Sequence, residues 1–229
     1  MENMGENNSP AKLPVQIRQS RRVSAFQRYR DVIKNGMFLF GVKNRLERLG
    51  IEIMPYYWVG EGMEDCTEPG IKGDISEFTL INLSLEEIKM LWKDAGDRVL
   101  EGRVEEYRQC PYCVGLEHHG EIAAYMFIGF KDLNFKGKLF PLKENEAYLA
   151  NMWTFHSFRG RNLAPYLRYK CYQLLKEQGR DTNYSITEYF NKSSIKFKNK
   201  LNAKNLNLFI YFNFFGKWQK HYLLKTYTD

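Results

Sequence analysis

The sequence FRGRNLAPYL, at residues Phe158–Leu167, says most about how this chain folds. It follows an apolar, strand-like run at residues 147–155 and leads into a helix-like run that ends at Gln178-Gly179. A glycine-containing turn that opens a helix directs several backbone N–H groups to one point, where the helix dipole adds positive potential. Such a corner holds a phosphate or a diphosphate, and Arg159 and Arg161 can add charged hydrogen bonds to it.

The composition fits one globular domain. The chain has 229 residues, and 44% of them are hydrophobic, which is enough for a sizeable core. Aromatic residues make up 15%, a high share that fits a sheet-rich core or a cleft lined by rings. The net charge of +7 favours an anionic partner, whether nucleic acid, an acidic membrane or a phosphorylated ligand. The charge alone does not choose among these partners.

Hydropathy and cysteine content indicate a cytoplasmic protein. Apolar runs such as Met37–Val42 are far shorter than a membrane span, and the N-terminus has no apolar stretch resembling a signal peptide. Four cysteines in a chain of this length do not make a disulfide scaffold. We therefore expect a cytoplasmic location and no membrane partner.

Residues 1–30 form a basic N-terminal segment that we expect to be partly disordered, ahead of a single domain at residues 31–229. Pro10 and Pro14 discourage an early helix, and a helix is plausible only through Val23–Tyr29. The segment is interpreted as a solvated tail, with a nucleic-acid-binding arm as the alternative. Residues 31–49 show helical spacing that ends at a glycine, which is a C-cap signal.

Strands and helices follow in mixed order from residue 51. The expected strands cover residues 51–59, 110–118, 121–130, 146–155, 183–189, 206–215 and 220–227. The expected helices begin at the capping box Ser84–Glu87 and cover residues 98–108, 161–178 and 193–201. Residues 60–73 and 132–143 are expected to be loops. The pattern predicts a mixed α/β fold without internal repeats.

This pattern resembles the GNAT superfamily (Gcn5-related N-acetyltransferases). The family has a phosphate loop, Arg/Gln-x-x-Gly-x-Gly/Ala, and the six matching residues here are Ser157–Asn162, which keep the first glycine. A later family motif, Asn-x-x-Ala-x-x-x-Tyr-x-Lys-Leu-Gly-Phe, matches residues Asn191–Ala203 and keeps Asn191 and Lys200-Leu201. The order of elements fits from about residue 51 to residue 229. The resemblance implies a twisted, mainly antiparallel sheet with flanking helices, in which the parallel fourth and fifth strands splay apart.

The chain departs from the family pattern at three places. Asn162 replaces the second glycine, but asparagine can adopt a positive φ, so the turn is expected to survive. Lys198 stands where many members have a tyrosine that protonates the leaving thiolate, so that role cannot be carried over. Asn202-Ala203 replaces Gly-Phe, which makes the last turn of the motif atypical.

The resemblance implies acetyl-CoA or another acyl-CoA as cosubstrate, and no metal. Backbone N–H groups of the loop would hold the diphosphate, the strand before it would pair with the pantetheine arm, and Asn191 would bind the pantetheine or adenine side. An extended ligand beside a strand needs only backbone donors, so the side chains there can vary. The implied cofactor-binding residues are Met152, Trp153, Thr154, Arg159, Gly160, Arg161, Asn162, Leu163, Ala164 and Asn191.

The implied reaction is attack of a neutral amine on a thioester. An amine with a pKa near 10 is mostly protonated at neutral pH, so a base must take its proton. Glu146 lies fourteen positions before Gly160, where some family members have a general-base glutamate; otherwise it is a surface carboxylate at a strand start. Glu188 and His156 are the rival candidates for the base.

Two further catalytic roles stay open. The oxyanion could be held by a backbone N–H near Trp153 or Thr154. The thiolate acid could be Tyr184 or Tyr189, although both fit strand packing better.

Two cysteine and histidine patterns are interpreted as structural. Residues Cys110–Cys113 read Cys-Pro-Tyr-Cys, as in the glutaredoxin active site, but redox chemistry needs the first cysteine at a helix N-terminus. Here the motif precedes a strand, so buried cysteines are expected. The same pair with His118 and His119 could suggest zinc, but adjacent histidines alternate faces on a strand, so we expect no metal site.

The sequence therefore predicts an N-acyltransferase acting on a small-molecule primary amine, with an amino sugar among the candidates. One alternative is a basic nucleic-acid-binding or protein-interaction module without catalysis, supported by the tail and by lysines 192, 196, 198 and 200. Another is an aminoacyl or peptidyl transferase, a class that usually has two such domains. Nucleic acid is not an expected partner, whereas the ring-rich strand at residues 206–215 could close the acceptor site or form a homodimer.

Overall fold

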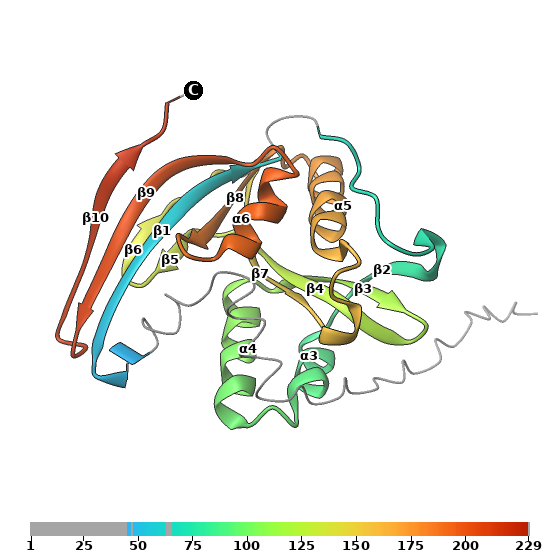
Figure 1. The fold of residues 1–229 in the computed structure, drawn as a ribbon, viewed down its shortest axis with the longest axis horizontal. Coiled ribbons are helices and arrows are strands. Elements are labelled where there is room, and N and C mark those ends of the chain that lie inside the picture. Colours follow the sequence, from blue (N-terminus) through green and yellow to red (C-terminus); the bar gives the residue numbers. More distant parts are fainter. Residues whose placement is uncertain (1–44, 47, 63–65, 229) are drawn as a thin grey trace, which may run out of the picture.

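A computed structural model describes residues 45–46, 48–62 and 66–228 and shows one large sheet (Figure 1). The eight strands lie in the order β10-β9-β1-β8-β7-β4-β3-β2. Their bounds are β1 (Ile51–Glu61), β2 (Phe78–Asn82), β3 (Tyr112–His118), β4 (Glu121–Gly129), β7 (Glu146–Thr154), β8 (Thr182–Glu188), β9 (Lys204–Phe214) and β10 (Trp218–Thr226). A separate hairpin is formed by β5 (Leu133–Phe135) and β6 (Lys138–Phe140).

Helices cover both faces of the sheet. One face, here called the α5 face, packs against α5 (Leu163–Glu177) and α6 (Lys192–Asn199) through Leu167, Leu175 and their neighbours. The other, the α4 face, packs against α3 (Leu85–Trp92), α4 (Asp97–Gln109) and the β5–β6 hairpin. Side chains alternate along the central strand, so Ala147 and Leu149 face α5 whereas Tyr148 and Ala150 face α4.

The predicted fold class is confirmed. All neighbouring strands of the large sheet pair antiparallel except β7 and β8, which are parallel. Pairing of β7 with β8 covers three residue pairs, from Glu146 opposite Thr182 to Tyr148 opposite Tyr184. Beyond them β7 stays bonded to β4 and β8 to β1, so the two central strands diverge as a wedge.

The strand β1 lies between β8 and β9 and is antiparallel to both. It reaches from Ile51 opposite Phe214 to Glu61 opposite Asn183. A strand from the start of the domain therefore joins two strands from its end. It also carries a carboxylate, Glu61, into the middle of the molecule.

Several sequence predictions are confirmed locally. The capping box forms, with Glu87 N–H donating to Ser84 Oγ at 3.3 Å and Ser84 N–H donating to Glu87 Oε2 at 2.7 Å. The helix expected at residues 98–108 is α4, and the hairpin around Gly120 is β3–β4. The predictions for residues 1–44, including the disordered segment and most of the helix at residues 31–49, lie outside the described residues.

One loop prediction is wrong, and one strand was not predicted. Residues 132–143 contain the β5–β6 hairpin, whose three-residue strands are too short to show a period-two pattern. Its turn residues Lys136 and Gly137 both have a positive φ, 52° and 84°, as a two-residue hairpin turn requires. The edge strand β2 was also missed because only its first residue is fully buried. Among the described helices, none is long and apolar enough to cross a membrane.

Candidate active site

The loop after β7 takes the conformation that its sequence indicates. A short 3-10 helix at His156–Phe158 leads to Gly160 with φ +81° and Asn162 with φ +67°, and α5 begins at Leu163. The expectation that asparagine supports the left-handed turn is confirmed. A Cβ on Gly160 would meet nothing within 4 Å, so the glycine is needed for its backbone angle and leaves open space beside the helix N-terminus.

The two arginines of the loop lie along neighbouring side chains. Arg159 donates from Nε to the Thr154 carbonyl at 3.1 Å, and its guanidinium lies 5.7 Å from the Trp153 ring centre. The Arg161 guanidinium lies 5.5 Å from the Phe158 ring centre. Both cations therefore flank the loop, which raises the positive potential at the helix N-terminus.

A second segment braces the loop, which the sequence did not predict. Asn162 donates from Nδ2 to the Gly70 carbonyl at 2.6 Å, and Lys72 N–H donates to the Arg161 carbonyl at 2.9 Å. Lys200 donates from Nζ to Asn162 Oδ1 at 2.7 Å. The residue that replaces the second family glycine therefore fixes the loop to two other parts of the chain, and it brings a lysine beside the loop.

The wedge between β7 and β8 leads to this loop. Opposite β4, the register of β7 shifts near its middle, and Asn151 there has φ +34°. This is a β-bulge, which leaves backbone groups of β7 outside the regular ladder with β4. From Tyr148 to Thr154 the open side of β7 is about 20 Å long, at about 3.3 Å per residue.

On the α4 face, a carboxylate and a phenol meet at the closed end of the wedge. Glu146 is buried and accepts hydrogen bonds from Lys143 N–H at 2.8 Å and from the Tyr184 hydroxyl at 3.2 Å. Burial and the nearby Glu146 carboxylate raise the pKa of Tyr184, so this hydroxyl stays protonated as a donor. The Tyr184 ring stacks on Trp58 at 4.9 Å, which makes an aromatic wall beside the carboxylate.

On the α5 face, at the same closed end of the wedge, the sheet carries a buried ionic cluster, here called the Glu61 cluster. Its members come from four elements and are at most 5% exposed: Glu61, Arg168, Tyr172, Ser185, Thr187 and Lys198. Glu61 forms ion pairs with Arg168 Nε at 3.0 Å and Lys198 Nζ at 3.2 Å, and accepts from the Tyr172 hydroxyl at 2.5 Å. Lys198 also donates to Ser185 Oγ and Thr187 Oγ1, each at 2.5 Å.

The Glu61 cluster carries an excess of positive charge. Burial would raise the pKa of Glu61, but the Arg168 and Lys198 cations outweigh it and hold that pKa well below its ordinary value. Burial lowers the pKa of Lys198 although Glu61 favours its charged form. Two cations thus face one carboxylate, which leaves a buried surplus of one positive charge on this face, near the closed end of the wedge.

The three candidates for the base are not brought together. Glu146 lies at the closed end of the wedge, about 20 Å along β8 from Glu188 and about 26 Å along β7 from Thr154, two residues before His156. Glu188 lines a shallow pocket of about 360 Å³ with Glu52, Met54 and Lys136 among others. Only Glu146 among the three lies where β7 and β8 begin to separate.

The remaining predicted residues have defined places. Met152 packs toward the α5 face, and Trp153 packs toward the α4 face at 5.2 Å from the Trp92 ring. Asn191 caps α6 by accepting from Ser194 N–H at 3.1 Å. Lys198, on the same helix, stands where the family has a tyrosine, so the sequence assigns it no role. Its ion pair with Glu61, 137 positions earlier, is one that no local pattern indicates.

The predicted burial of the cysteine motif is confirmed. Cys110 follows the last residue of α4 instead of opening a helix, and both Cys110 and Cys113 are buried. Burial raises the pKa of Cys110 to about 12 and raises that of Cys113 further, so neither forms a reactive thiolate at neutral pH.

Comparison with known proteins identifies the class. The model of the acetyltransferase (GNAT) family matches residues 78–202, which is more than half of the chain. The chain therefore belongs to the GNAT acetyltransferase family, and the predicted resemblance is confirmed. No curated protein sequence matches it.

Solved structures agree on the fold. A GNAT-family acetyltransferase from Colwellia psychrerythraea has a TM-score of 0.51 and 15% identity, covering 72% of this chain and 57% of that one. The glucosamine N-acetyltransferase region of a fungal multi-domain GH3 β-N-acetylglucosaminidase has a TM-score of 0.52 and 12% identity, covering 76% and 23%. A tandem GNAT protein of the clavulanic acid pathway has a TM-score of 0.50 and 15% identity, covering 74% and 54%. The chain thus spans little more than half of these proteins, or less.

Proposed function

We propose that the protein is an N-acyltransferase that moves an acetyl or other acyl group from acyl-CoA to a small-molecule primary amine. The observation that carries this proposal is the wedge between β7 and β8, which ends at a left-handed loop opening α5. The wedge offers backbone donors to an extended arm, and the loop offers N–H groups to a diphosphate. Flanking Arg159, Arg161 and Lys200 suit the negative charge of that ligand.

Bound acyl-CoA would supply a thioester carbonyl for the amine to attack. Glu146, held by Lys143 N–H and Tyr184, accepts the proton that the amine nitrogen loses, directly or through one water. A backbone N–H beside the β7 bulge, between Met152 and Thr154, faces the negative charge that develops on the carbonyl oxygen.

The Glu61 cluster acts on the leaving sulfur in this proposal. When the carbon–sulfur bond breaks, the electron pair stays on sulfur, and the positive surplus of the cluster stabilises that thiolate. Lys198 is the member that can give a proton, because burial lowers its pKa and makes it a better acid than an ordinary lysine. Lysine thereby serves where many family members have tyrosine.

The aromatic side chains beside Glu146 suggest which kind of amine the protein accepts. Trp58, Phe140 and Tyr184 form a stacked wall on the side of Glu146, which fits a ring-shaped amine such as an amino sugar. Acyl transfer would take place in the cytoplasm, where we also expect neither a membrane nor a nucleic-acid partner.

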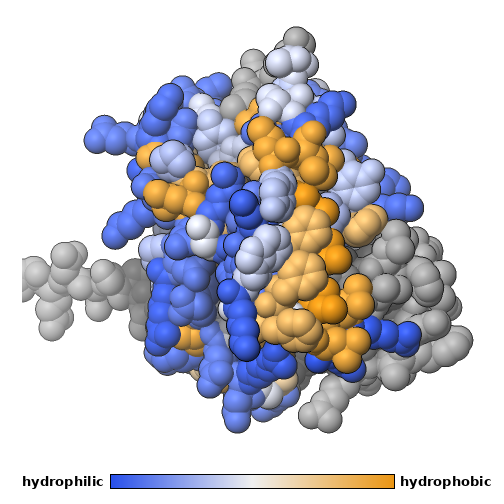
Figure 2. Space-filling view, turned by 90° about the vertical axis from the view of Figure 1, so that its left-hand side faces the viewer, coloured by the Kyte–Doolittle hydropathy of each residue, from blue (hydrophilic) through white to orange (hydrophobic). Residues whose placement is uncertain are grey.

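A homodimer is proposed through the outer strands. Figure 2 shows hydrophobic side chains gathered in a band on the side of the molecule formed by β9 and β10. Exposed apolar residues of these strands and their turn are Phe215, Trp218, Tyr222, Leu223 and Leu224. An apolar edge strand favours pairing with a second copy, so sedimentation should detect a dimer that Leu223→Lys weakens.

The test is calorimetric titration with CoA and acetyl-CoA. Gly160→Glu should lose binding about 100-fold or more, since it strains the turn and places a carboxylate where the diphosphate would lie. Gly179→Glu is the matched control: this glycine also has a positive φ, +77°, and an open Cβ position, but it follows the opposite end of α5. Equal binding by both variants would refute the loop assignment.

An acceptor screen that follows release of free thiol then tests the reaction. Turnover with a small primary amine supports the enzyme. If CoA does not bind and nucleic acid binds with strong salt dependence, the non-catalytic alternative is favoured.

A further inference from the structure

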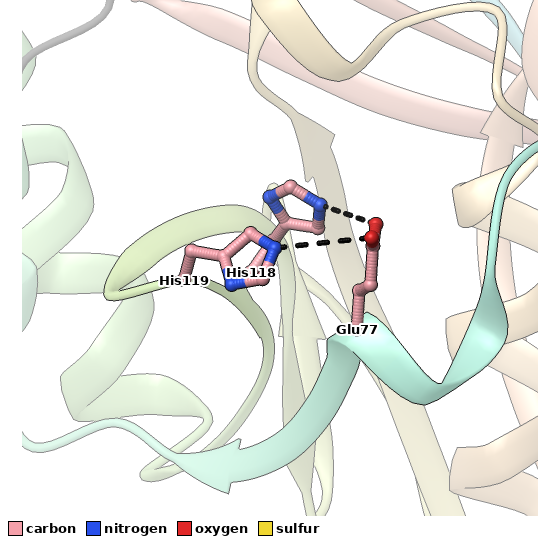
Figure 3. A group of neighbouring side chains, drawn as sticks. All are labelled: Glu77, His118 and His119. Atoms are coloured by element: carbon pink, nitrogen blue, oxygen red, sulfur yellow. Dashed lines mark hydrogen bonds and ion pairs between the residues drawn. The ribbon is translucent and has the colours of Figure 1, made fainter.

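Three side chains with metal-ligating atoms meet at the outer edge of the sheet (Figure 3). They are Glu77, at the end of a short 3-10 helix (Ile75–Glu77), His118, the last residue of β3, and His119 in the following turn. Their ligand atoms all lie within 4.8 Å of one another. Glu77 Oε2 is 3.1 Å from His118 Nε2, and Glu77 Oε1 is 4.0 Å from His119 Nε2.

The turn explains why adjacent histidines share one target. His119 has φ +50° and Gly120 has φ +82°, so the strand alternation ends at His118. The expectation that the two imidazoles point to opposite faces is wrong for this reason. The Glu117 carboxylate fixes the turn by accepting from Gly120 N–H at 2.9 Å.

The position of Glu77 follows from strand pairing, and His118 is held by packing. Phe78 pairs with His118, which places the preceding Glu77 beside the turn. The His118 ring lies 4.7 Å from the Phe78 ring and 5.4 Å from the Phe158 ring, and its side chain is 17% exposed. His119 and Glu77 are open to solvent, so an ion can reach the site from outside.

We propose that Glu77, His118 and His119 form a binding site for a divalent transition metal, with zinc as the preferred ion. Two imidazoles and one carboxylate are a donor set that Zn²⁺ accepts, whereas Mg²⁺ and Ca²⁺ prefer oxygen ligands. Three protein ligands leave a fourth tetrahedral position for water. This revises the sequence-based expectation of no metal, and it does not depend on the proposed acyl transfer.

The bound ion would brace the diphosphate loop. Phe158, which packs on His118, lies two residues before Gly160 in the same loop. An ion that ties Glu77, just before β2, to the β3–β4 turn would hold the His118 ring against Phe158. Its contribution is therefore structural, and zinc is expected to raise the midpoint of thermal unfolding.

The experiment uses the full chain without a polyhistidine tag, stripped of metal with a chelator, and titrated with Zn²⁺ by calorimetry and with Co²⁺ by visible absorption. We expect one equivalent to bind, with Co²⁺ bands typical of tetrahedral coordination. His118→Phe keeps a ring between the two phenylalanines, His119→Asn keeps a residue that tolerates positive φ, and Glu77→Gln keeps the side-chain shape. Each should weaken Zn²⁺ at least about tenfold, since even outer-shell changes cost about 10–100-fold.

His221→Gln is the control, because it removes an imidazole elsewhere, beside Tyr56. It should bind Zn²⁺ like the wild type. The proposal is overturned if the wild type binds no zinc, if the three variants bind as well as the wild type, or if the control loses binding equally.

Discussion

Two glutamates lie at the vertex of the wedge, on opposite faces of the sheet, and their surroundings differ. Glu146 accepts from a backbone N–H and a neutral phenol, with Arg180 bonded to its main-chain carbonyl. Glu61 lies between Arg168 and Lys198 and is held ionised by both. The end of the wedge therefore holds one carboxylate through neutral hydrogen-bond donors on the α4 face and another as the counterion of two cations on the α5 face.

Removal of Glu61 should have the largest effect on stability. Glu61→Ala leaves two buried cations without their carboxylate, and the free energy of unfolding should fall by about 3–5 kcal/mol. Lys198→Met is the matched comparison, because it leaves Glu61 and Arg168 as a one-to-one pair and should cost less than about 2 kcal/mol. Urea unfolding followed by circular dichroism measures both. Similar losses in the two variants would contradict the charge count.

Removal of the Glu146 carboxylate should have the largest effect on rate. Glu146→Gln should lower kcat by about 10²–10⁴-fold and leave acyl-CoA affinity within about twofold, because a proton acceptor is lost without loss of a CoA contact. Glu144→Gln, at an exposed neighbouring site, should behave like the wild type. Unchanged turnover in Glu146→Gln would move the base to Glu188 or His156.

Lys198→Met should slow the reaction less, by about 10²-fold, the lower end for a general acid. The wild-type rate should fall on the alkaline side at a pH below the ordinary lysine pKa of about 10.4, since burial lowers the pKa of Lys198 and neutral lysine cannot donate. Steady-state kinetics from pH 6 to pH 10 would show whether this limb disappears in the variant. A variant that keeps the limb would assign it to another group.

Acid should destabilise the protein through Glu61. Its folded-state pKa is lowered, so its contribution to stability is complete above the unfolded glutamate pKa of about 4.3 and is lost as pH falls toward the folded value. Thermal melts between pH 6 and pH 2.5 should therefore fall more steeply for the wild type than for Glu61→Gln. Parallel curves would mean that Glu61 is not the titrating group.

The smallest effect is expected at Tyr184. Tyr184→Phe removes one neutral hydrogen bond to Glu146 and should lower kcat by about tenfold or less, because such a bond is worth about 0.5–1.5 kcal/mol. Stopped-time product assays at fixed acyl-CoA measure it. A loss as large as that of Glu146→Gln would indicate that the phenol itself transfers a proton.

Local signals explain what the sequence predicted correctly. The Gly160 loop, the Ser84 capping box and the hairpin at Gly120 each depend on residues within a few positions, and the structure contains all three. The loop, the motif at residues 191–203 and the order of elements together indicated the GNAT family, and the predicted fold class followed from that resemblance. Short elements such as β2 and the β5–β6 hairpin offered too few residues for a pattern.

Long-range partnerships explain what the sequence did not predict. Asn162 was expected only to permit a turn, but it also bonds to Gly70 and Lys200. No local pattern predicts a role for Glu61, because its partners Arg168 and Lys198 are more than 100 positions away. The convergence of His118 and His119 depended on a left-handed residue that strand alternation does not describe.

The place of β1 has a practical consequence for any shortened form of the protein. The family match starts at residue 78, but in the described part of the chain β1 lies between β8 and β9 and carries Glu61, the carboxylate that pairs with Arg168. A fragment of residues 78–202 would lack β1, so the edge of β8 would be exposed. The buried cations Arg168 and Lys198 would also lose the Glu61 carboxylate that pairs with them. Expression trials should therefore begin upstream of Ile51, and folding must wait until the ribosome has released the last strands to meet the first.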